Sequence, residues 1–178
     1  MTNMKSIILF GYMCSGKSTV GKALAASLGY TFYDLDWFIE RRYHTTISDI
    51  FAQKGEPYFR DLERRMFQET AQFEDIVLAC GGGTPCFFDN ADFANTCGTT
   101  VYMKAAPDTI ISHLKISHTV RPLLQNRSDD ELLQFITEQM AEREPFYEKA
   151  QYTINVDVLD SYAKIDAFVK SLRKLIGL

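Results

Sequence analysis

Residues 6–19 read Ser-Ile-Ile-Leu-Phe-Gly-Tyr-Met-Cys-Ser-Gly-Lys-Ser-Thr, and this stretch decides the fold. From Gly11 to Ser18 it matches Gly-x-x-x-x-Gly-Lys-[Ser/Thr] at every fixed position. An apolar run precedes the glycines and an amphipathic segment follows them, which predicts a buried strand, a loop and a helix. Glycine lets successive N–H groups point at anionic oxygens, and the helix N-terminus adds positive potential. The stretch therefore predicts a cradle for the phosphates of a nucleoside triphosphate, with an ordinary glycine-rich turn as the alternative.

The loop and the first helical turn supply the candidate ATP ligands, which are Cys14, Ser15, Gly16, Lys17, Ser18 and Thr19. We expect Lys17 to reach the β- and γ-phosphates and the Ser18 hydroxyl to be a hard oxygen ligand for Mg²⁺. The thiol of Cys14 lies near a helix N-terminus, where thiols become more reactive. It either fills space or makes the ATP site sensitive to oxidation.

Length and composition exclude several classes of protein. The chain of 178 residues has the size of one domain, and its formal net charge of -4 argues against a broad nucleic-acid surface. No apolar run approaches the roughly 20 residues that span a bilayer, and no secretory signal is recognisable. The four cysteines form no Cys-x-x-Cys pair, which favours reduced thiols in the cytoplasm. We therefore expect a single cytoplasmic domain over residues 1–178, without membrane or nucleic-acid partners.

Short apolar runs alternate with longer amphipathic segments along the rest of the chain. Strands are expected at residues 6–10, 31–33, 76–80, 99–103 and 152–156. Helices are expected at residues 17–28, 37–43, 47–53, 56–73, 107–115, 129–143 and 161–176. Strands that are apolar throughout and separated by helices indicate right-handed crossovers and a sheet covered on both faces. The predicted fold is a three-layer α/β/α fold of P-loop NTPase type with a five-stranded parallel sheet.

Two carboxylates, Asp34 and Asp36, follow the second expected strand. Residues two apart in an extended chain face the same side, so both can look into the crevice at the carboxyl ends of the strands. One could hold the Mg²⁺ shell while the other accepts a hydrogen bond from an acceptor hydroxyl. The alternative for Asp36 is a helix N-cap.

Three arginines, Arg60, Arg121 and Arg143, are candidates for holding an anionic acceptor. Their planar guanidinium groups suit carboxylates and phosphates, although any one of them could be a solvated surface charge. Residues 116–128 contain a proline and lack apolar periodicity, which predicts a mobile lid that carries Arg121 onto the transferring phosphoryl group.

Three consecutive glycines, Gly81, Gly82 and Gly83, follow the strand expected at residues 76–80. They permit close approach of backbone to ligand and offer N–H donors, so a substrate site is favoured over a plain loop. The histidines show no ligand or triad spacing and are interpreted as ordinary residues: His44, His113 and His118.

Taken in order, these motifs resemble the shikimate kinase family over nearly the whole chain. The matching segments are Gly-x-x-x-x-Gly-Lys-Ser-Thr at 11–19, Asp34-x-Asp36, Phe59-Arg60-x-x-Glu63, the glycines at 81–83, Arg121-Pro122-Leu123-Leu124 and Arg143-x-Pro145-x-Tyr147. The resemblance implies transfer of the ATP γ-phosphate to the 3-hydroxyl of shikimate by a monomer, and a sheet order of 2-3-1-4-5. It also implies that residues 36–73 form the substrate-binding helices.

The resemblance further implies roles for single residues. Ser18 would bind Mg²⁺ directly and Asp34 through its water shell. Asp36 would contact the shikimate hydroxyls and accept the proton, acting with Lys17 and Arg121 in catalysis. The remaining substrate ligands would be Arg60, Arg143 and the glycines Gly81, Gly82 and Gly83.

The chain also departs from the family pattern. Arginines that contact adenine in relatives are missing, since residues 111–115 read Ile-Ser-His-Leu-Lys and residues 155–157 read Asn-Val-Asp. Lys115 or His113 could replace them, and base preference could be loose. Two rival functions stay open, namely a gluconate kinase on the same scaffold and a nucleotide-binding module without transfer activity.

Overall fold

The computed structural model describes residues 6–116, 128–159 and 162–178. Its five parallel strands form one sheet in the order β2-β3-β1-β4-β5. Their bounds are β1 Ser6–Phe10, β2 Thr31–Asp34, β3 Ile76–Ala79, β4 Gly98–Lys104 and β5 Tyr152–Asn155. The predicted parallel α/β fold and the order 2-3-1-4-5 are both confirmed.

The middle of the sheet is buried on both faces, as the apolar runs predict. Every residue of β1 and of β3 is buried, and Ile8 pairs in register with Leu78 on one side and Thr100 on the other. Carboxyl ends of parallel strands share one edge of the sheet. The loops after β1, β2 and β3 therefore meet at that edge.

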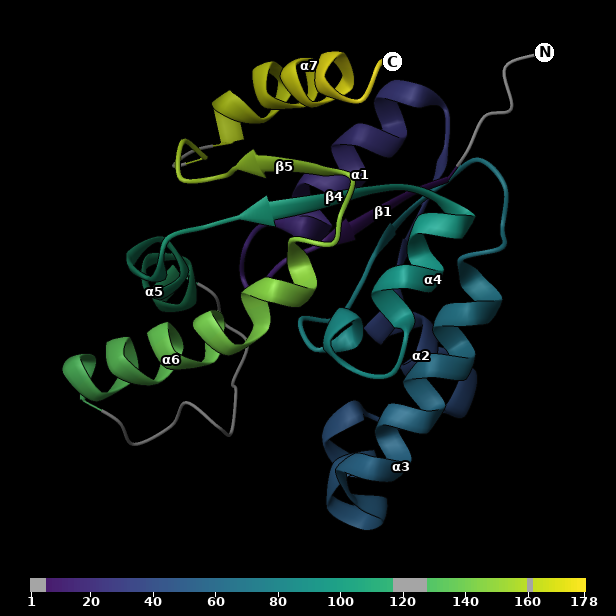
Figure 1. Ribbon diagram of the computed structural model, residues 1–178, viewed down its shortest axis with the longest axis vertical. Helices are drawn as coiled ribbons and strands as arrows, with labels where there is room; N and C mark the ends of the chain where they lie inside the picture. The colour runs from purple at the N-terminus through teal and green to yellow at the C-terminus, as the bar shows by residue number, and fades with distance from the viewer. Residues whose placement is uncertain (1–5, 117–127, 160–161) are drawn as a thin grey trace.

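Helices cover both faces of the sheet (Figure 1). Helix α1 (Lys17–Leu28) packs with α7 (Ile165–Leu175), whereas α4 (Asn90–Cys97) packs on β4 and contacts α3 (Ile47–Thr70). The remaining helices are α2 (Leu35–Tyr43), α5 (Pro107–Ile116) and α6 (Asp129–Tyr147), with short 3-10 helices η1 (Thr84–Cys86) and η3 (Tyr162–Lys164). None of the helices within the described ranges combines the length and apolar character needed to cross a membrane.

Local signals explain several helix boundaries. Gly29 ends α1 in a left-handed conformation, and its N–H bonds to the carbonyl of Ala25. Ser128 opens α6 with a complete capping box to Glu131. The helices expected at 47–53 and 56–73 are two segments of α3, separated by non-helical backbone at Gly55.

Three helical segments differ from the prediction. Helix α4 and η1 were not expected, because Asn, Asp and Thr in residues 90–97 are poor helix formers; burial of Ala91 and Ala94 stabilises α4 instead. Helix α6 continues beyond Arg143 and through Pro145, since its last residue, Tyr147, is anchored in the core.

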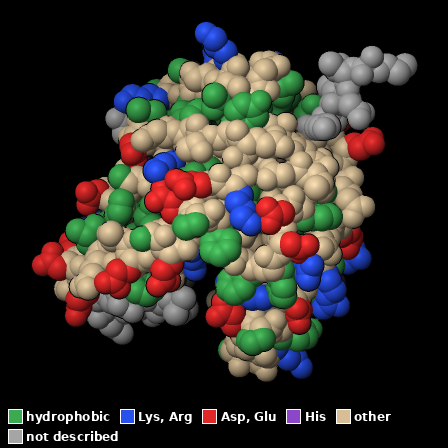
Figure 2. Space-filling view, in the orientation of Figure 1, with side chains coloured by type: hydrophobic (Ala, Val, Ile, Leu, Met, Phe, Trp, Pro, Cys, Tyr) green, Lys and Arg blue, Asp and Glu red, His purple; other side chains and the backbone are tan. Residues whose placement is uncertain are grey.

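Figure 2 shows a notch in the surface between the α6 side and the α3 side of the molecule.

Candidate active site

The phosphate loop follows β1 with the backbone that its glycines allow. Gly11 has φ 147°, and a Cβ there would lie 2.8 Å from the carbonyl oxygen of Met103, so only glycine fits. Gly16, at φ 87°, turns the chain into α1. Of the other predicted loop residues, Ser15 is buried, Cys14 is half-buried with φ 58°, and Thr19 is exposed.

The ammonium group of Lys17 is folded onto this loop. Its Nζ donates hydrogen bonds to the carbonyls of Gly11 and Tyr12 at 2.8 and 2.7 Å. Burial lowers the pKa of Lys17 to about 8, an effect that the negative charge of Asp36 opposes. The loop thus holds a partly desolvated cation, and an anion bound beside it would stabilise its charged form.

Asp34 connects the carboxyl end of β2 to the phosphate loop. Its Oδ2 accepts a hydrogen bond from the Ser18 hydroxyl at 2.7 Å, and its Oδ1 accepts from the backbone N–H groups of Asp36 and Trp37. The N-cap of α2 is therefore Asp34, and the alternative that Asp36 caps this helix is wrong. The hydroxyl and the carboxylate predicted to serve Mg²⁺ lie in direct contact.

Asp36 reaches the site by a route that differs from the prediction. It lies in the first turn of α2 and not on extended chain, so the argument from two-residue strand spacing is wrong. Its Oδ1 nevertheless lies 3.0 Å from the position that a Cβ on Gly81 would occupy. The carboxylate thus faces the triglycine loop and is close enough to Lys17 to influence its pKa.

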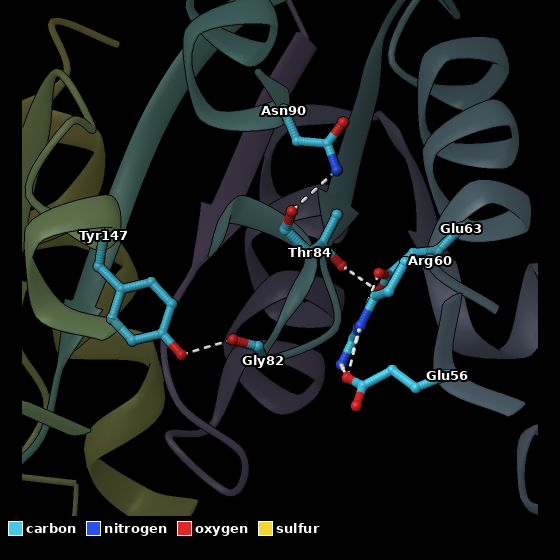
Figure 3. A network of polar contacts seen from close by, with 7 residues as sticks. All are labelled: Glu56, Arg60, Glu63, Gly82, Thr84, Asn90 and Tyr147. Atoms are coloured by element: carbon cyan, nitrogen blue, oxygen red, sulfur yellow. Dashed lines mark hydrogen bonds and ion pairs between the residues drawn. The ribbon is translucent and has the colours of Figure 1, made fainter. Parts of the chain in front are cut away.

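Arg60 projects from α3 toward the same loop and is held by two carboxylates (Figure 3). Its Nη1 donates to Glu63 at 2.8 Å, and its Nε and Nη2 donate to Glu56 at 3.1 and 3.0 Å. The ring of Phe87 covers the guanidinium at 4.1 Å. A Cβ on Gly83 would come within 2.8 Å of Nη1 and Nη2, so a side chain there would push the guanidinium of Arg60 aside.

Arg143 approaches the triglycine loop from α6. Its Nη1 would lie 3.6 Å from a Cβ on Gly82, and its guanidinium sits 5.5 Å from the ring centroid of Tyr12. The hydroxyl of Tyr147 donates to the carbonyl of Gly82 (Figure 3). It also hydrogen-bonds with Arg143. In the described part of the chain, Arg143 has no ion-pair partner, unlike Arg60.

Polar contacts hold the triglycine loop beside the phosphate loop. The buried hydroxyl of Thr84 donates to Glu63 at 2.6 Å, and the amide of Asn90 donates to the carbonyl of Thr84 at 2.9 Å. A Cβ on Gly82 would lie 3.2 Å from the backbone nitrogen of Met13. Arg60, Arg143 and the phosphate loop therefore border one site.

The sequence patterns assign no role to two residues of this site. Glu63 belongs to the motif Phe59-Arg60-x-x-Glu63, but only the fold shows that it is a buried carboxylate that orients Arg60. Tyr147 ends the motif Arg143-x-Pro145-x-Tyr147, and only the fold shows its hydrogen bonds with Gly82 and Arg143. His113, expected to be an ordinary residue or a substitute for a missing adenine-side arginine, lies in α5 with its Nδ1 2.8 Å from the carbonyl of Cys14. Since a carbonyl only accepts, Nδ1 is the donor.

The predictions for Arg121 and for the lid concern residues that the structure does not describe. Arg121 and all but the ends of the lid expected at residues 116–128 lie outside the described residues. Immediately before and after this segment, Lys115 in α5 and Asp129 in α6 form an ion pair at 2.8 Å.

Comparisons with known proteins all point to one family. The family model of shikimate kinase matches residues 13–173. The shikimate kinase of Phocaeicola vulgatus is 48% identical over 171 residues, which cover 96% of this chain and 98% of the relative. The crystal structure of shikimate kinase from Bacteroides thetaiotaomicron superposes with a TM-score of 0.95 at 45% identity, covering 98% of this chain and 99% of that one.

A second similar structure contains shikimate. The shikimate kinase from Acinetobacter baumannii in complex with shikimate superposes with a TM-score of 0.84 at 33% identity, covering 98% of this chain and 94% of that one. The family match spans most of the chain, and the relatives are matched over nearly their full length. This chain belongs to the shikimate kinase family.

Proposed function

We propose that this chain transfers the γ-phosphate of ATP to the 3-hydroxyl of shikimate. The observation that carries the proposal is the approach of two guanidinium groups, those of Arg60 and Arg143, to a triglycine loop that touches the phosphate loop. An acid bound between them would have its alcohol next to the triphosphate. Phosphoryl transfer requires such positioning and charge stabilisation more than covalent help.

The acceptor would be held at its carboxylate. A guanidinium donates in a planar fork that matches a carboxylate, and the backbone N–H groups of residues 81–83 add neutral donors. Arg143 is the stronger candidate for the first contact because Tyr12 and Tyr147 orient it without neutralising it. This arrangement supports the predicted substrate roles of Arg60, Arg143 and the three glycines.

The ATP side would be held by the loop amides, by Lys17 and by the Ser18–Asp34 pair. The residues fit Mg²⁺, because this ion takes one or two protein oxygens and completes its shell with water and phosphate oxygens. When bound, Mg²⁺ neutralises charge on the β- and γ-phosphate oxygens. Ser18 would ligate it directly, and Asp34 would accept hydrogen bonds from its water shell.

Asp36 would accept the proton of the attacking hydroxyl. Its carboxylate faces Gly81 and is near Lys17, so it would lie between an acid bound at the triglycine loop and a triphosphate bound at the phosphate loop. Lys17 and Arg121 would stabilise the charge that develops on the transferred phosphoryl group. The role of Arg121, the monomeric state and the cytoplasmic location stay predictions from the sequence.

A coupled assay of ADP release tests the proposal. We expect ADP release that depends on shikimate and is absent with gluconate. Release with gluconate alone would favour the rival kinase, and ATP binding without release for either acid would favour a non-catalytic module. The relatives, which are shikimate kinases at 46–48% identity, favour the first outcome.

A further inference from the structure

The guanidinium of Arg60 is not a vacant receptor for an acid. Glu56 Oε1 accepts from both Nε and Nη2, which form one edge of the guanidinium, while Glu63 Oε2 accepts from Nη1. One positive charge therefore faces two negative charges. A carboxylate that arrives at Arg60 meets a locally negative cluster and finds one hydrogen-bonding edge taken.

The two carboxylates differ in how firmly they are held. The side chain of Glu63 is 1% exposed and also accepts the hydrogen bond of Thr84, so losing Arg60 would leave a buried charge. The side chain of Glu56 is 53% exposed, and the described residues provide it with no partner other than Arg60. An exposed pair four residues apart on a helix is weak. Of the two carboxylates, Glu56 is the one that an incoming anion can displace.

The backbone around Glu56 favours such a displacement. Gly55 has φ 80° and ψ 171° and interrupts α3, and Pro57 follows Glu56, so Glu56 stands at the start of the second helical segment. The positive potential of a helix N-terminus stabilises a carboxylate in its first turn. The charge of Glu56 therefore keeps a favourable environment after its side chain leaves Arg60.

We propose that Glu56 is an internal competitor of the substrate carboxylate for Arg60. It occupies the Nε/Nη2 edge while the site is empty and must be displaced when an acid binds there. Glu56 thereby weakens the affinity of the site for the acid. This inference rests on the proposed function, in which Arg60 binds the carboxylate of shikimate.

The test is a calorimetric titration of the full chain with shikimate and with shikimate amide, which has the same ring but no carboxylate charge. We expect Glu56→Gln and Glu56→Ala to lower the Kd for shikimate by about two- to tenfold, the range for loss of a weak competing ion pair and of one charge repulsion. The Kd for the amide should change by less than half of that factor. Glu69→Gln is the matched control, because Glu69 lies on the same helix and pairs with Arg42, away from the site. It should leave both values unchanged.

The outcomes separate this inference from the proposed function. If the Glu56 variants bind shikimate as weakly as the wild type or more weakly, Glu56 supports Arg60 and the inference is overturned. It is also overturned if the amide gains as much as the acid, because competition between charges would then not be the cause. A wild-type chain that neither binds shikimate nor releases ADP in its presence would overturn the proposed function instead.

Discussion

The hydroxyl of Tyr147 donates a hydrogen bond to the backbone carbonyl of Gly82, and this contact joins the end of α6 to the triglycine loop. Burial raises the pKa of Tyr147, so its hydroxyl stays protonated and able to donate. The same hydroxyl hydrogen-bonds with Arg143. One side chain therefore orients both a peptide unit and a guanidinium that we assign to the acceptor.

Tyr147→Phe should weaken acceptor binding, because it leaves the Gly82 carbonyl without its donor and frees Arg143. Loss of one such hydrogen bond is worth about 1 kcal/mol, so we expect the KM for shikimate to rise about three- to tenfold. The KM for ATP should not change. Steady-state kinetics with each substrate varied in turn measures both values. Tyr152→Phe, on β5, is the control, since the described contacts give its hydroxyl no hydrogen-bond partner; an equal effect of both variants would contradict the role of Tyr147.

Those parts of the fold and site that depend on local pattern could be predicted from the sequence. The phosphate loop, the buried strands β1 and β3 and the cap at Ser128 each have a signature within a few residues. The roles of Asp34 and Asp36 depended on where β2 ends and α2 begins, and an error of two residues there reversed which of them caps the helix.

Contacts between distant segments could not be predicted in this way. Tyr147 and Gly82 are 65 residues apart, and His113 and Cys14 are 99 apart. No periodicity or motif within one segment encodes such a pair, because it arises only when the sheet has brought the segments together. The pairing of Arg60 with Glu56 is local, but whether it affects substrate binding depends on the triglycine loop that faces Arg60.

Replacing Asp34 should separate its two functions. Asp34→Asn keeps an oxygen that can cap α2 but removes the charge near the Mg²⁺ position, so we expect the Mg²⁺ concentration for half-maximal activity to rise about 10- to 100-fold. Asp34→Ala also removes the cap, which costs about 1 kcal/mol of folding stability, and should lower the Tm by about a further 2–4 °C. Titration of activity with Mg²⁺ and thermal melting measure the two effects. A shared loss of Tm without any change in Mg²⁺ dependence would show that Asp34 is only a cap.

Asp36→Asn should affect the chemical step. Removing a general base costs about 10²–10⁴ in rate, and the amide can still contact a substrate hydroxyl. We therefore expect kcat to fall by that factor while ATP still binds, as measured by single-turnover kinetics and by equilibrium titration of ATP. If kcat fell less than tenfold, proton transfer to Asp36 would not be part of the reaction.

The pH dependence of ATP binding should follow Lys17. Its pKa in the free protein is about 8, since burial lowers it, and a bound triphosphate favours the ammonium form. Below pH 8 the ammonium is already present, whereas above pH 8 binding must take up a proton. The affinity for ATP should therefore fall as pH rises from 8 to 10, by at most about tenfold per pH unit.

Titrations from about pH 6.5 to about pH 9.5 would measure this loss of affinity. Calorimetry in buffers of different ionisation enthalpy would measure the proton uptake. AMP is the control ligand, because it lacks the β- and γ-phosphates that Lys17 is expected to contact. Asp36 raises the pKa of Lys17, so Asp36→Asn should move the onset of the loss to lower pH. An ATP affinity that stays constant through pH 9, or an onset unmoved by Asp36→Asn, would mean that the Lys17 ammonium does not govern triphosphate binding in this pH range.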